Sequence, residues 1–108
     1  MMEKEKRIEL YQKALSKWGE EAQINMVYEE IGELLTALSR FKRGRANHND
    51  IMTELADVSI MVEQIAALMN YEDFENEKDY KLARLKERLE KNGEDEKGNA
   101  TWNAKGNI

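Results

Sequence analysis

Four stretches of the chain place apolar residues three or four positions apart, which is the spacing of one buried face of an α-helix. We expect helices over residues 3–18, 20–43 and 72–91, and a third helix that is capped by Asn49 or Asp50 and ends near residue 70. The sequence contains no proline that would break any of them. The pattern therefore predicts an all-α fold, a bundle of four helices.

The second and third helices have the strongest patterns. Their apolar positions are Ile24, Val27, Ile31, Leu34, Leu35 and Leu38, followed by Ile51, Leu55, Val58, Val62, Ile65 and Met69. The third helix has further apolar residues on its other sides, so we expect it to be central, buried within its subunit or between subunits. A short loop over residues 44–49 joins the two helices, which predicts that they pack antiparallel.

Each of these two helices also contains a pair of acids. Glu30 and Glu33 lie on the second helix, and Glu54 and Asp57 lie on the third, and residues three apart share a helix face. Two like charges about 4 Å apart repel by roughly 4 kcal/mol at an effective dielectric of about 20. The four acids must therefore be protonated, paired with Lys or Arg, or arranged around a cation. Magnesium suits such a cluster of oxygen ligands.

The order and spacing of these acids resemble the MazG-like, all-α nucleoside triphosphate pyrophosphohydrolases, in particular small phage and bacterial members. The resemblance covers roughly residues 14–89. The matching segments are Gln23 to Asn25, Glu29-Glu30, Glu33-Leu34, Glu54-Leu55-Ala56-Asp57-Val58 and Tyr80-Lys81-x-x-Arg84-Leu85.

The resemblance implies a hydrolase that converts a nucleoside triphosphate and water to a monophosphate and pyrophosphate, as in nucleotide-pool house-cleaning. It implies Mg²⁺, or Mn²⁺ in its place, and a homodimer or homotetramer with sites near the subunit interface. It assigns metal binding to Glu30, Glu33, Glu54 and Asp57. It assigns catalysis to Glu29 and Glu30, and substrate binding to Asn25, Lys81 and Arg84.

Other interpretations remain open at this stage. One alternative is a non-catalytic helical oligomerisation or interaction module. In that case the acids would have a structural role, and each acid would be paired with Lys or Arg. Gln23 and Asn25 fit surface polar positions as well as contacts to a base or sugar, and Trp18 fits an aromatic core position as well as a stacking surface. A di-iron site of the Glu-x-x-His type is disfavoured because His48, the single histidine, falls in the predicted loop. The chain lacks a P-loop motif.

Composition narrows the class of protein further. The 108 residues suit one domain, which we expect over residues 1–92, and residues 93–108 lose all periodicity and are predicted to be disordered, although they include Trp102. A net charge of −5 argues against a nucleic-acid polymer as partner. The absence of cysteine, of a signal peptide and of a long apolar run predicts a cytoplasmic protein without a membrane partner.

Overall fold

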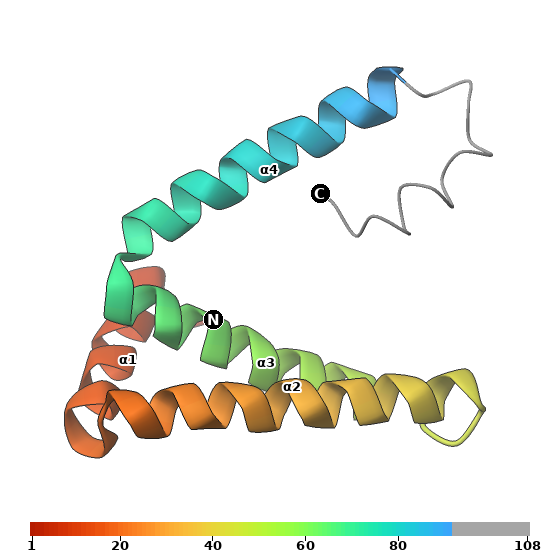
Figure 1. Ribbon diagram of the computed structural model, residues 1–108, viewed down its shortest axis with the longest axis horizontal. Coiled ribbons are helices and arrows are strands. Elements are labelled where there is room, and N and C mark those ends of the chain that lie inside the picture. The colour runs from red at the N-terminus through yellow and green to blue at the C-terminus, as the bar shows by residue number, and fades with distance from the viewer. Residues whose placement is uncertain (92–108) are drawn as a thin grey trace. The chain divides into compact units, whose positions relative to one another are not determined.

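The computed structural model describes residues 1–91, and this part of the chain forms four helices and no strand (Figure 1). The helices are α1 (Lys4–Trp18), α2 (Glu20–Lys42), α3 (His48–Met69) and α4 (Tyr71–Lys91). The predicted all-α class is confirmed, and none of the described helices has the length and apolar character needed to cross a membrane.

The chain divides into two units, one over residues 1–71 and one that begins at residue 72. The second unit contains α4 from Glu72 onward. The single domain expected over residues 1–92 stays a prediction. The predicted disorder of residues 93–108 lies outside the described residues, as does Trp102.

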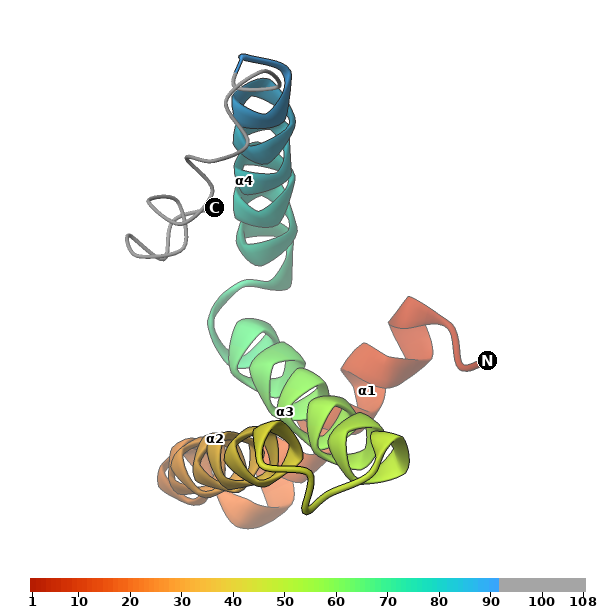
Figure 2. The ribbon, with the colours of Figure 1, turned by 90° about the vertical axis from the view of Figure 1, so that its right-hand side faces the viewer.

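In the first unit α2 and α3 lie side by side and run antiparallel, while α1 packs against both (Figures 1 and 2). Gly19 makes the sharp turn between α1 and α2 with φ of 89°, a left-handed conformation that glycine adopts without a steric penalty. Its N–H donates to the Leu15 carbonyl at 2.8 Å, which closes the last turn of α1. The antiparallel packing of α2 and α3, which the short loop over residues 44–49 predicts, is confirmed.

The start of α3 differs from the prediction. Asn47, and not Asn49 or Asp50, is the N-cap: its side-chain oxygen accepts from the Asp50 N–H at 2.9 Å, and the Asp50 carboxylate accepts from the Asn47 N–H at 2.9 Å. This reciprocal capping box satisfies two backbone donors that the helix itself cannot. His48 therefore begins the helix instead of lying in the loop, although it is exposed as expected.

The buried apolar core of the first unit is small. Its members come from α1 and α3: Tyr11, Ile51, Met61 and Ala66. Beside it, the Tyr11 hydroxyl and the Arg7 Nε both donate to Glu63 Oε1, the latter at 3.1 Å. Burial, together with the neighbouring Glu63 carboxylate, raises the pKa of Tyr11 to about 12, so the phenol stays a donor at neutral pH. This polar cluster ties α1 to α3.

Two sequence interpretations of apolar positions are corrected. Trp18 is 58% exposed, so it is not a core residue of the described unit, and its ring lies instead under the Lys17 ammonium. Nor is α3 buried on all sides within its own subunit, because Leu55 and Val62 are exposed. Burial of α3 between subunits stays a prediction.

One full stripe of α2 is apolar and exposed. Its residues recur at spacings of four, three, four and three, so they share one helix face: Ile24, Tyr28, Ile31, Leu35 and Leu38. At 3.6 residues per turn, this face points nearly opposite to the one that contains Glu29 and Glu33. Exposed apolar surfaces of this length are typical of interaction sites.

Candidate metal and substrate site

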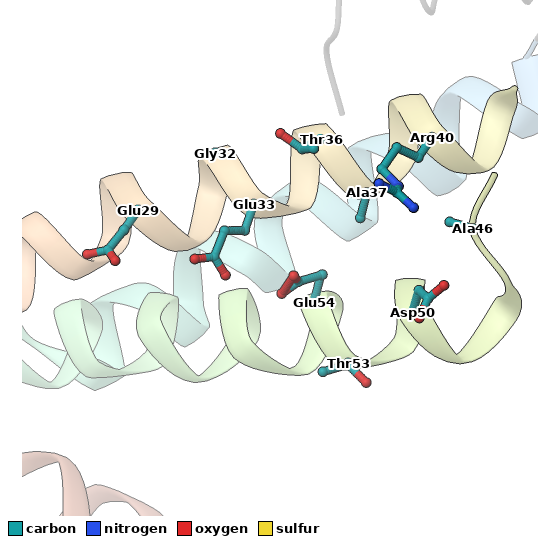
Figure 3. A pocket seen from close by; sticks show the side chains of 10 residues that line it. All are labelled: Glu29, Gly32, Glu33, Thr36, Ala37, Arg40, Ala46, Asp50, Thr53 and Glu54. Atoms are coloured by element: carbon teal, nitrogen blue, oxygen red, sulfur yellow. The ribbon is translucent and has the colours of Figure 1, made fainter.

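Three of the four predicted metal ligands come together at the contact between α2 and α3. Glu30, Glu33 and Glu54 each offer a carboxylate oxygen, and these oxygens lie within 4.8 Å of one another. Glu30 and Glu33 share a face because they are three residues apart, and Glu54 approaches from the antiparallel neighbour. Figure 3 shows the Glu33 and Glu54 side chains pointing toward each other. These three carboxylates could in principle hold a metal ion, for which oxygen atoms are suitable ligands.

The fourth predicted ligand, Asp57, is not one of these three converging carboxylates, but it acts on the same site. It follows Glu54 by three residues on α3 and is half-buried. Its negative charge contributes to the pKa shifts of both Glu30 and Glu54. Asp57 therefore lies close enough to add to the local negative potential.

Burial and the neighbouring acids raise the pKa values of two glutamates. Desolvation is the largest cause at Glu30, followed by the charges of Glu33 and Asp57, and it is also the largest cause for the raised pKa of Glu54, ahead of the same two charges. Within the described residues, no Lys or Arg forms an ion pair with these acids. The cationic partners required by a purely structural acid cluster are not found there.

The acids open onto a surface pocket of about 730 Å³ between α2, α3 and the loop that joins them (Figure 3). Glu29, Glu33 and Glu54 line it on the acidic side, together with Gly32. A Cβ atom at Gly32 would meet nothing within 4 Å, so close packing against a helix of the described chain does not explain this glycine. Gly32 instead leaves the pocket wall beside the acids without a side chain.

Arg40 also lines this pocket, and the sequence analysis did not single it out. It follows Glu33 by seven residues, two helical turns, which places both on the same face of α2. This two-turn spacing in the sequence could have identified Arg40 as a residue on the same face as the acids. Asn25, a predicted substrate residue, is exposed on α2 and precedes Glu29 by four residues, which places it along the same face.

Lys81 and Arg84, the predicted phosphate ligands, lie three residues apart on α4. Both belong to the second compact unit, so their role at the acids stays a prediction. Within α4, the Arg84 guanidinium lies 5.8 Å from the centroid of the Tyr80 ring.

Gln23 is not the surface residue that its polarity suggests. Gln23 is only 3% exposed. Within the described part of the chain, neither its side-chain nitrogen nor its side-chain oxygen has a hydrogen-bond partner. The side-chain oxygen of Gln64 on α3 is also buried and has no hydrogen-bond partner among the described residues. Buried amides without partners typically cost about 1–3 kcal/mol each, so these two glutamines reduce stability as they stand.

The raised pKa values predict how stability depends on pH. A carboxyl group with a higher pKa in the folded than in the unfolded chain binds its proton more tightly when folded, so its contribution favours folding at low pH. This contribution is lost as the pH rises from 4.5, the ordinary pKa of a glutamate, through the raised pKa values of Glu30 and Glu54. Without metal, we expect the melting temperature to fall over this interval, and to fall less in the Glu30→Gln variant.

Thermal unfolding monitored by circular dichroism from pH 4 to pH 8 would measure this effect. Glu9→Gln, the same change at an exposed glutamate of α1, is the matched control and should follow the wild-type curve. A Glu30→Gln curve as steep as wild type would mean that other groups cause the decline.

Comparisons of the chain with models of known protein families, with curated proteins and with solved structures found no match. The fold and the geometry of the site are therefore the basis for assigning a function.

Proposed function

We propose that the protein is a magnesium-dependent nucleoside triphosphate pyrophosphohydrolase. The observation that carries the proposal is the convergence of Glu30, Glu33 and Glu54 from two helices, with no cationic partner among the described residues. Glu33 and Glu54 also line a pocket. Hard carboxylate oxygens fit Mg²⁺, which commonly binds through a few carboxylates together with substrate phosphates. When bound, the ion would supply charge neutralisation at the phosphate oxygens and a more acidic water.

The chain's own residues have distinct roles in this proposal. Glu30, Glu33, Glu54 and Asp57 hold the cation. Glu29 also lines the pocket but is not one of the three converging acids, so it is free to accept a proton from the attacking water or to orient it. Lys81 and Arg84 on α4, with Asn25 on α2, bind the substrate.

The reaction products test this proposal. Attack of water on the α-phosphorus breaks the bond to the β-phosphate, so each triphosphate should give one monophosphate and one pyrophosphate. We expect a panel of ribo- and deoxyribonucleoside triphosphates, assayed with Mg²⁺, to yield pyrophosphate and no orthophosphate, with activity lost in EDTA. Release of orthophosphate alone from every nucleotide would reject the proposal.

A non-catalytic interaction module with a structural acid cluster is the second candidate, and the exposed apolar stripe of α2 favours it. The two candidates differ in their response to metal. Binding at 100 times the dissociation constant stabilises a fold by about 2.7 kcal/mol, and a structural cluster gains nothing of the kind. A magnesium-dependent rise in melting temperature, absent with Na⁺ at equal ionic strength, would favour the enzyme.

We also propose that the protein is a homodimer or a dimer of dimers. The α2 stripe, with Leu55 and Val62 of α3, is the apolar surface that a second copy would cover. Because the stripe points away from Glu29 and Glu33, such an association leaves the pocket open to substrate.

A further inference from the structure

The pocket between α2 and α3 has acids at one end and an arginine at the other. Glu29, Glu33 and Glu54 line one end, and Arg40 lines the other, next to Ala46 and Asp50 at the start of α3 (Figure 3). Glu33 and Arg40 are separated by two turns of α2, a rise of about 10.5 Å along the helix axis. The Arg40 side chain extends from α2 toward the α2–α3 loop, into the space that the acids also face.

Arg40 is held in place by the loop without losing its capacity to bind an anion. One of its guanidinium nitrogens, Nη2, donates to the Arg45 carbonyl at 3.0 Å, and Gly44 makes the turn that brings this carbonyl back, with φ of 74°. A guanidinium has five N–H donors, so one such bond leaves most of them available. Within the described residues Arg40 has no carboxylate partner, although Asp50 lines the same end of the pocket.

A ligand that fills both ends must satisfy two demands. At the acids it must present oxygens to a bound cation, and two turns away it must present an anion to a guanidinium fork. A single phosphate cannot span both places, whereas a chain of phosphates carries negative oxygens at successive positions. Arginine suits the distal end because its planar fork matches two phosphate oxygens at once.

We propose that Arg40 binds the distal phosphate of a metal-bound polyphosphate, an inference that rests on the proposed function and adds a substrate residue to it. The α-phosphate then lies at Glu30, Glu33 and Glu54, and the chain of phosphates runs along α2 toward the loop. The nucleoside extends in the opposite direction, toward Asn25. Arg40 contacts the phosphate farthest from the acids, and it belongs to the same compact unit as they do.

Binding of inorganic tripolyphosphate and of pyrophosphate in the presence of Mg²⁺, measured by isothermal titration calorimetry, tests Arg40 without relying on turnover. Loss of a charge-assisted hydrogen bond typically costs enough to weaken binding about ten- to a hundredfold. We expect Arg40→Ala to weaken tripolyphosphate binding by this factor and pyrophosphate binding by less, because the shorter chain held at the acids does not reach Arg40. Arg40→Lys should recover part of the loss.

Arg43→Ala is the matched control. Arg43 is an exposed arginine of the same segment and also makes one side-chain hydrogen bond, from Nη1 to Ser39 Oγ at 3.2 Å, but it does not line the pocket. If Arg40 only stabilised the loop, Arg40→Ala would lower the melting temperature but would leave the preference for the longer chain as it is in wild type and in Arg43→Ala.

The outcomes separate this inference from the proposed function. Tripolyphosphate binding that is weakened in Arg40→Ala and unchanged in Arg43→Ala supports the role of Arg40. Equal binding by wild type and Arg40→Ala overturns it, as does equal weakening for both probes or a wild-type protein that binds neither. The proposed function fails separately, if the wild-type protein releases no pyrophosphate from any nucleoside triphosphate.

Discussion

The Glu54→Gln variant should lose at least about a thousandfold in turnover while it keeps its fold. A neutral amide is a poor replacement for a carboxylate at a magnesium site, and a bound metal accounts for a large part of transition-state stabilisation in this class of chemistry. In the metal-free protein the same change relieves repulsion, since Glu33 and Asp57 contribute to the raised pKa of Glu54. The melting temperature without metal should therefore stay equal or rise.

Steady-state pyrophosphate release and thermal unfolding with and without Mg²⁺ measure both halves of this expectation. Glu21→Gln, the same substitution at an exposed residue in the first turn of α2, should retain wild-type turnover and the wild-type response to magnesium. A Glu54→Gln protein with wild-type activity would show that Glu54 is not a ligand. An inactive variant that also unfolds at a much lower temperature would assign Glu54 a structural role.

Much of this site could be predicted because helical periodicity fixes which residues share a face. The three-residue spacing of Glu30 and Glu33, and the short loop after α2, were enough to predict that their carboxylates face α3. The convergence with Glu54 follows from antiparallel packing of two helices joined at one end. Whether a metal binds there does not follow from periodicity, and it stays a prediction.

Features that depend on local turn geometry or on neighbouring helices were harder to predict. Asn47, Asn49 and Asp50 are all acceptable N-caps by residue type, and the reciprocal hydrogen bonds that select Asn47 depend on the path of the loop. The burial of Gln23 depends on tertiary packing, and polarity alone suggests the opposite. Trp18 shares the spacing of its stripe but extends past the packed surface, so periodicity misplaces it.

Leu35→Glu should convert the proposed oligomer to a monomer. Leu35 is 62% exposed in the apolar stripe of α2, one helical turn from its middle residue, Ile31. Placing a carboxylate there forces an unpaired charge into an apolar contact. Substitution of a central interface residue often costs more than 2 kcal/mol, and a twofold interface contains the change twice. We therefore expect the dissociation constant to rise at least about a hundredfold.

Analytical ultracentrifugation over a range from nanomolar to micromolar protein would measure this shift. Leu10→Glu is the matched control, because Leu10 is an exposed leucine of α1, 50% accessible, that lies outside the stripe. The control should sediment as the wild type does, whereas Leu35→Glu should sediment as a monomer and melt at a lower temperature. The stripe would lose its assignment as an interface between copies if the wild-type protein were itself a well-folded monomer at micromolar concentration. If Leu35→Glu sedimented as the same oligomer as the wild type, the interface would have to lie on another surface. That result would not bear on the chemistry proposed for the pocket.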